Sequence, residues 1–156
     1  MTERLYYSDS YLHSFQARIV ERLEDNGRPV VVLDRSAFYP TSGGQPADRG
    51  TLNQASVVDV IERESDGEVL HVLSGPLAAT DVLGAIDSAR RFDLMQQHTG
   101  QHILSQAFSQ SLEAETISFH LNDDPRDGAA TIDLSTPDLK AEQIERVEDL
   151  ANSIVF

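Results

Sequence analysis

Arg90-Arg-Phe-Asp-Leu-Met-Gln-Gln-His-Thr-Gly-Gln-His-Ile-Leu-Ser-Gln-Ala-Phe108 is the stretch around which the rest of this sequence is organised. It lies within residues 90–111, for which the hydrophobic pattern predicts one helix. Apolar or small side chains recur there at steps of three and four residues, which is the spacing of one helical face. The predicted face consists of Phe92, Met95, Thr99, Ile103 and Ala107.

Two histidines, His98 and His102, stand four residues apart inside this predicted helix. Side chains at that spacing lie one above the other on the same face, so two imidazoles can converge on one metal ion. The alternative is an ordinary helix with one buried and one exposed histidine, and spacing by itself favours that alternative. Thr99 follows His98 where zinc proteases carry a glutamate, so metalloprotease chemistry is not supported.

The composition is that of one domain or two small ones, with 156 residues of which 40% are hydrophobic. There is no run of 18 apolar residues, so we expect no membrane span, and the first residues lack the apolar stretch of a signal peptide. The absence of cysteine excludes disulfides and thiolate ligands within this sequence. We therefore expect a cytoplasmic protein.

The formal charge is −14, from 26 acidic and 12 basic residues, and only one residue is a lysine. Nucleic-acid binders are usually basic, so binding of nucleic acid would require a local cluster of arginines. The candidates are Arg35, Arg49, Arg90 and Arg91. An acidic, solubilising surface is the simpler interpretation, and a high-salt cytoplasm is another.

The first half of the sequence predicts a small β-barrel or folded sheet over residues 1–88. Asn26-Gly27 is a strong hairpin signal between two of the strands. The predicted strands are residues 4–7, 14–23, 29–34, 51–52, 55–63, 68–73 and 81–86.

The second part, residues 89–156, predicts an α+β domain that follows the barrel. After the first helix come strands at 116–121 and 129–134, a turn at 122–128, and a helix at 138–155 with Thr136 as N-cap and Pro137 at its first position. The apolar face of that helix is predicted to hold Ile144, Val147, Ala151 and Ile154. A two-stranded ribbon is marginal by itself, and the last residues are apolar. Both features predict a C-terminal truncation, or self-association through the apolar end.

A glycine- and proline-rich loop, Phe38-Tyr-Pro-Thr-Ser-Gly-Gly-Gln-Pro-Ala-Asp-Arg-Gly50, separates two of the barrel strands. Its consecutive glycines allow positive φ and a close approach of the backbone to another group. Gln45 offers both a donor and an acceptor at the tip. A simple tight turn is the alternative interpretation of this loop.

The loop and the histidine pair together resemble the editing domain of alanyl-tRNA synthetase, and most closely the free-standing alanyl-tRNA editing proteins. The shared pattern is Phe-Tyr-Pro-x-x-Gly-Gly-Gln-Pro-x-Asp-x-Gly, followed by His-Thr-x-x-His-Ile-Leu. Ile117-Ser-Phe-His-Leu121 and Thr131-Ile-Asp-Leu134 fit the same family, and the resemblance covers nearly the whole sequence. It implies a translation-factor-like barrel, followed by an α/β editing fold shared with threonyl-tRNA synthetase and incomplete here.

The resemblance also implies hydrolysis of mischarged alanine-specific tRNA, chiefly seryl-tRNA or glycyl-tRNA. It implies a zinc ion held by His98 and His102 together with a later cysteine and histidine, which this sequence lacks. We therefore expect zinc to be bound weakly or not at all. Gln45 and Gln101 are the candidate catalytic residues. The candidate substrate-binding residues are Thr41, Ser42, Gly43, Gly44, Thr116, Ser118 and His120.

Two interpretations from other functional classes stay open. The sequence could be a tRNA- or protein-binding module without chemistry, which the missing ligands and the acidic charge favour. It could also be an accessory domain of a longer enzyme like alanyl-tRNA synthetase. The expected partner of the full-length protein is mischarged tRNA, and no membrane partner is expected.

Overall fold

The computed structural model describes residues 1–123, 129–136 and 138–155. The chain divides into two compact units, of which the first contains Met1–Ser42 and Pro46–Phe92, and the second Gly43–Gln45 and Asp93–Phe156. The predicted domains, 1–88 and 89–156, stay a prediction, because compactness within one chain does not measure independent folding.

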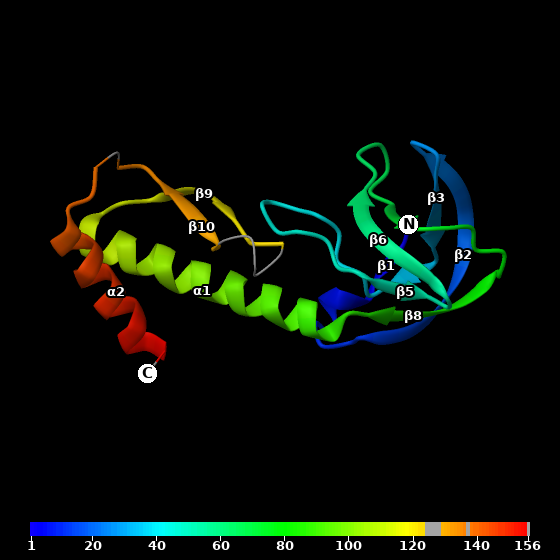
Figure 1. Cartoon of the computed structure of the whole chain (residues 1–156), viewed down its shortest axis with the longest axis horizontal. Coiled ribbons are helices and arrows are strands. Elements are labelled where there is room, and N and C mark those ends of the chain that lie inside the picture. Colours follow the sequence, from blue (N-terminus) through cyan, green and yellow to red (C-terminus); the bar gives the residue numbers. More distant parts are fainter. Residues whose placement is uncertain (124–128, 137, 156) are drawn as a thin grey trace. The chain divides into compact units, whose positions relative to one another are not determined.

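The first unit is built around a closed barrel, as the sequence predicts (Figure 1). The strands follow one another around the barrel in the order β2-β3-β7-β6-β5-β8, and each pairs with its neighbours in antiparallel fashion. The short strands β1 and β4 form a separate parallel pair. The strands are β1 (Glu3–Arg4), β2 (Ser14–Asp25), β3 (Arg28–Leu33), β4 (Arg35–Ser36), β5 (Gly50–Leu52), β6 (Ala55–Glu62), β7 (Val69–Leu73) and β8 (Asp81–Ile86).

Strand β2 shows how the sequence pattern produces the barrel core. Phe15, Ala17 and Ile19 are buried while the residues between them are exposed, because successive side chains of a strand point to opposite faces. The ring of Phe15 lies over Gly84 of β8, where a Cβ would come within 2.4 Å of the ring. Glycine at that position therefore allows β2 and β8 to pair.

The predicted strand at residues 4–7 is wrong after Arg4. Leu5–Tyr7 form a 3₁₀ helix, in which the N–H groups of Ser8 and Asp9 donate to the carbonyl of Leu5. The apolar run does not continue as a strand because β4, the partner of β1, is only two residues long.

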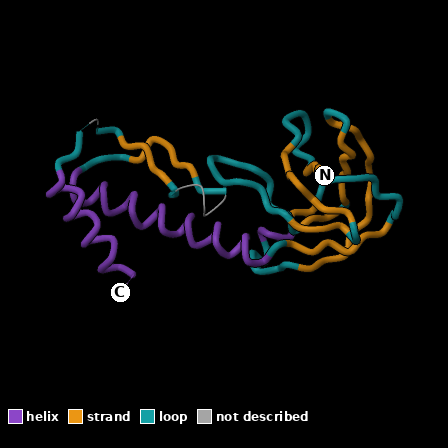
Figure 2. Tube along the Cα trace, in the orientation of Figure 1, coloured by secondary structure: helices purple, strands orange, loops and turns teal. Residues whose placement is uncertain are grey.

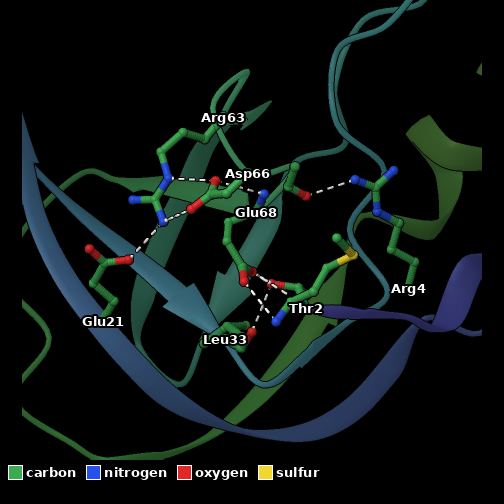
Figure 3. Close-up of polar contacts among 9 residues, drawn as sticks. Thr2, Arg4, Glu21, Leu33, Arg63, Asp66 and Glu68 are labelled. Carbon is green, nitrogen blue, oxygen red and sulfur yellow. Dashed lines mark hydrogen bonds and ion pairs between the residues drawn. The ribbon is translucent and has the colours of Figure 1, made fainter.

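A polar network fixes the N-terminus to the turn between β6 and β7 (Figure 3). Glu68 accepts from the Thr2 N–H and hydroxyl groups, each at 2.7 Å, and from the terminal ammonium of Met1 at 2.9 Å. These contacts hold the pKa of Glu68 below its usual range. Arg63 pairs in turn with Asp66 at 2.7 Å, so the predicted turn carries its own ion pair.

The barrel encloses a histidine, His71, that the sequence analysis did not single out. Its Nδ1 lies 3.2 Å from the Val31 carbonyl, which only accepts, so Nδ1 carries the proton. Its Nε2 then accepts from the Ser36 hydroxyl at 2.7 Å. Full burial lowers the pKa of His71 to about 4, so the ring is neutral inside the barrel.

A buried ion pair holds the first turn of α1 (Ser88–Leu112) to the barrel. Arg91 and Asp48 are 7% and 2% exposed, and Arg91 Nε donates to Asp48 at 2.8 Å while Nη2 donates to the second carboxylate oxygen. Nη1 and Nη2 of Arg91 also donate to the carbonyls of Ser10 and Ala37, at 2.8 and 2.7 Å. Both charges are therefore compensated inside the fold.

The second unit consists of the rest of α1, a two-stranded antiparallel ribbon and a second helix (Figure 2). The ribbon is formed by β9 (Thr116–His120) and β10 (Thr131–Leu134), and α2 covers Ala141–Val155. This agrees with the predicted order of elements. The predicted turn at 122–128 lies mostly, and Pro137 and Phe156 lie entirely, outside the described residues.

The predicted apolar face of α1 is wrong in part, because Phe92 and Thr99 are exposed. The buried residues of the helix are Arg91, Leu94, Gln101, Ala107 and Phe108. The buried face of α1 is thus rotated about the helix axis from the predicted face. The prediction used apolar residues alone and so left out Gln101, which is polar but buried.

The small core of the second unit joins the two helices. Ala107 and Phe108 of α1 pack with Val147 of α2, which is 1% exposed. Of the predicted α2 face, Val147 and Ala151 pack in this core, whereas Ile144 and Ile154 are 47% and 55% exposed. In the described part of the chain, no helix is long and apolar enough to cross a membrane.

We predict that acid destabilises the protein through His71. The ring has a pKa of 6.5 in its ordinary state and about 4 in the fold, so the unfolded chain takes up the proton first as the pH falls. Stability present above pH 6.5 is then lost progressively down to about pH 4. The shift corresponds to a loss of about 3 kcal/mol.

Urea unfolding across this pH range tests the prediction. His71→Gln keeps a donor and an acceptor but does not titrate, so its stability should change less with pH than that of the unmodified chain. His13→Gln, at an exposed position, is the matched control. Parallel curves for His71→Gln and the unmodified chain would contradict the prediction.

We also predict that Arg91→Lys lowers the free energy of unfolding by about 3 kcal/mol, because lysine cannot make the forked contact and leaves Asp48 buried without its full partner. Arg28→Lys, at an exposed position, should change it by less than about 0.5 kcal/mol. Replacing both partners by apolar residues, in Arg91→Met with Asp48→Leu, should restore part of the loss. A cost below about 1 kcal/mol for Arg91→Lys would show that the pair is not a stabilising constraint.

Candidate functional site

The two histidines of α1 face each other. The ring centroids of His98 and His102 are 4.8 Å apart, and their Nε2 atoms are separated by 2.9 Å. His98 is half-buried and His102 is exposed. Burial, and secondarily the charge of His102, lowers the pKa of His98. The rings therefore converge, which is an arrangement that the four-residue spacing allows.

The Gly43–Gln45 turn reaches the same place. Gln45 Oε1 lies 2.7 Å from His98 Nδ1. Gly43 and Gly44 have φ values of +54° and +87°, in the region that favours glycine. The loop is therefore more than a connection between barrel strands, because its tip belongs to the second unit and contacts the histidine pair.

The end of β9 holds this turn in position. The N–H of Leu121 donates to the carbonyl of Gly44 at 3.0 Å, and a Cβ at Gly44 would lie 2.0 Å from the carbonyl oxygen of Phe119. The Phe119 ring lies 5.6 Å from that of His98. Only glycine allows the backbone at position 44 to come this close to β9.

A second glutamine, Gln97, joins α1 to the segment that follows the same end of β9. Gln97 Oε1 accepts from the N–H of Asn122 at 2.8 Å, and its amide nitrogen donates to Asp93 at 2.8 Å. Gln97 and Phe119 were not among the site residues predicted from the sequence. Phe119 could have been predicted from its place in the strand between the candidates Ser118 and His120, because its side chain points to the opposite face from theirs.

The three candidates on β9 do not share one environment. The pairing register shifts between Asp133 and Leu134, so that Ile117 is an extra residue in β9. Thr116 donates to Ser105 of α1 at 2.7 Å, whereas Ser118 donates to Asp133 of β10.

His120 also lies beside Asp133, at 3.7 Å, with 69% of its side chain exposed. Strand alternation would put residues 116, 118 and 120 on one face, and the bulge separates the first from the other two. Thr116 is therefore the one of these three that reaches α1.

Gln101 is 8% exposed, and its amide nitrogen donates to Ser105 at 2.8 Å. Its Oε1 is buried and has no hydrogen-bond partner among the described residues. An unpaired buried acceptor is unfavourable by about 1–3 kcal/mol, so a donor that reached this oxygen would stabilise the fold.

The remaining two candidates, Thr41 and Ser42, are exposed and belong to the first unit. The N–H of Thr41 donates to the carbonyl of Val60 at 2.9 Å, as expected of a residue that supports the loop.

The donor set for a metal is incomplete within the described residues. Zinc sites in proteins use three or four protein ligands, and His98 and His102 supply two. Two nitrogens on one tetrahedral zinc lie about 3.3 Å apart, so the observed 2.9 Å would need a small separation of the rings. No group of three potential ligands is found in the described ranges. The residues present therefore do not fit a complete zinc site.

The arginines that could contact nucleic acid are in part used within the fold. Arg91 is enclosed with Asp48, so the sequence-based suggestion that it contacts nucleic acid is wrong. Arg90 donates to the carbonyl of Ala47 at 2.9 Å, and Arg35 lies 3.5 Å from Glu3.

The chain is similar to known proteins over nearly its whole length. A family model described as tRNA synthetases class II (A) matches residues 2–90. The chain is 40% identical over 161 residues to an alanine–tRNA ligase of Pyrobaculum neutrophilum, with 99% of this chain and 17% of the relative covered. It is 37% identical over 164 residues to the alanyl-tRNA editing protein AlaX-L of Pyrococcus horikoshii, with 100% of this chain and 39% of the relative covered.

The alanyl-tRNA editing protein AlaX-M of the same organism is 42% identical over 115 residues, which cover 72% of this chain and 51% of the relative. The chain thus spans 17% to 51% of the length of these curated relatives. The family model covers more than half of the chain, and the matches to the relatives extend through the histidine pair. The chain therefore belongs to the class II (A) tRNA synthetase family, together with the alanyl-tRNA editing proteins and alanine–tRNA ligases that it resembles.

Proposed function

We propose that this chain takes part in tRNA editing, by hydrolysis of the ester of mischarged alanine-specific tRNA. The observation that carries the proposal is the convergence of His98, His102 and Gln45 at the end of β9. The names of two relatives, both called alanyl-tRNA editing proteins, point in the same direction. Mischarged tRNA is the proposed partner and the cytoplasm the proposed location.

Ester hydrolysis requires a positioned water, a proton acceptor and stabilisation of the developing oxyanion. The lowered pKa of His98 favours its neutral ring, whose Nε2 lone pair can accept a proton from a water molecule that replaces the contact with His102. The free Oε1 of Gln101 can receive a hydrogen bond from a donor. These two groups are the proposed catalytic contributions of α1.

Seryl-tRNA and glycyl-tRNA are the proposed substrates. A synthetic site for alanine cannot strongly reject the smaller glycine, or a serine that merely adds a hydroxyl, so a second hydrolytic site is needed. Polar groups that read the serine hydroxyl would reject alanine, because they would be left unpaired. Thr116, Ser105 and Gln101 form a connected polar chain that could supply such groups.

A second candidate function is a tRNA- or protein-binding module without chemistry, or an accessory domain of a longer synthetase-like enzyme. The incomplete set of metal ligands in the described residues favours it. Self-association belongs with this proposal, because Ile154 and Val155 are 55% and 59% exposed. Light scattering of the purified chain would reveal a dimer.

We predict that hydrolysis of seryl-tRNA falls by about 100-fold or more in His98→Ala and in His102→Ala, as expected for loss of a proton-transfer group. The assay should include alanyl-tRNA as a control substrate, which we expect not to be hydrolysed. His13→Ala, at an exposed position in the first unit, is the matched control. Full activity of both site variants would favour the non-catalytic alternative.

We further predict that the purified chain binds zinc weakly or not at all, because His98 and His102 provide two ligands where three or four are needed. Metal analysis after dialysis should give far less than one zinc per chain. One tightly held zinc per chain would mean that other groups complete the site.

A further inference from the structure

The two ring nitrogens of His98 have different neighbours. Nδ1 lies 2.7 Å from the amide oxygen of Gln45, and Nε2 lies 2.9 Å from Nε2 of His102. An amide oxygen only accepts hydrogen bonds, so Nδ1 must carry a proton to make the first contact. A neutral imidazole has one N–H group, and its other nitrogen is then a lone pair.

The position of Gln45 is itself constrained. The turn that carries it has two residues at positive φ, and the carbonyl of Gly44 accepts from the N–H of Leu121. The absence of a side chain at Gly44 lets the turn lie against the backbone of Phe119. The oxygen of Gln45 is therefore presented to the ring by a fixed backbone.

The ring of His98 is also held from another side. Phe119 of β9 packs against it at a centroid distance of 5.6 Å and an angle of 49°. Rotation of the imidazole, which would exchange its two nitrogens, would have to disturb this packing. The tautomer and the ring orientation thus depend on the same small group of contacts.

We propose that Gln45 is a positioning residue that fixes His98 in the tautomer protonated at Nδ1. This keeps the lone pair of His98 on Nε2, the nitrogen that faces His102. Gln45 then acts through His98 rather than by contact with a substrate. In the opposite tautomer, an N–H of His98 would be directed at His102 and Gln45 would have to offer its amide nitrogen in place of its oxygen.

Side-chain ¹⁵N–¹H correlation spectra of the whole chain, recorded without tRNA or metal at mildly alkaline pH, test this proposal. The unmodified chain should show His98 mainly protonated at Nδ1. Gln45→Leu should shift the ratio of the two tautomers by about fivefold towards protonation at Nε2, as expected for loss of one hydrogen bond. Gln45→Glu retains an acceptor oxygen and should keep the original tautomer.

Gln96→Leu is the matched control, because Gln96 is an exposed glutamine on α1, the helix that carries His98. The spectrum of this variant should match that of the unmodified chain. Circular dichroism establishes that each variant is folded, and Gln45→Glu keeps the test decisive should Gln45→Leu fail to fold. A chain whose His98 is protonated mainly at Nε2, or a folded Gln45→Leu variant with an unchanged ratio, would overturn the proposal. The proposal concerns the same site as the proposed hydrolysis, but the spectra need no substrate, so the two can fail separately.

Discussion

The buried pair between Asp48 and Arg91 is the constraint on which the arrangement of the first unit depends. Two charges removed from water are tolerated only when each is almost fully hydrogen-bonded, and here both carboxylate oxygens and the guanidinium donors have partners. Asp48 follows the glycine-rich turn by a few residues, and Arg91 precedes His98 by seven. The pair therefore fixes, within the first unit, the residues that follow the Gly43–Gln45 turn and the first turn of α1.

Within the second unit, contacts to the backbone hold the Gly43–Gln45 turn and α1 against the end of β9. Gly44 lies against the carbonyl of Phe119, and Gln97 binds the backbone of Asn122. These contacts place the end of β9 beside the histidine pair. The bulge at Ile117 then decides which β9 side chains take part, because it turns Thr116 towards α1 and leaves Ser118 with Asp133. The site is consequently built from short-range polar contacts on a thin scaffold of one helix and a ribbon.

The ion pairs of the first unit show how the basic residues of this acidic chain are used. Several arginines are held by carboxylates or carbonyls of the first unit, as Arg4, Arg63 and Arg91 illustrate. The charge of −14 is therefore accompanied by basic groups that serve the fold. These three arginines therefore contribute to the fold, whereas basic nucleic-acid binders present such groups to phosphates.

The sequence by itself determined the barrel, the order of the later elements and the pairing of His98 with His102, because strand alternation, hairpin signals and helical spacing are local properties of the chain. It also brought Gly43, Gly44 and Gln45 into consideration through motif resemblance. Only the tertiary structure decided that Gln45 contacts His98, that Arg91 is enclosed with Asp48, and that the β9 candidates separate. Those outcomes depend on long-range packing and on one inserted residue in a strand, neither of which leaves a periodic signal in the sequence. The same holds for the buried side of α1, where polar Gln101 replaces the apolar residue that a helical pattern would lead one to expect.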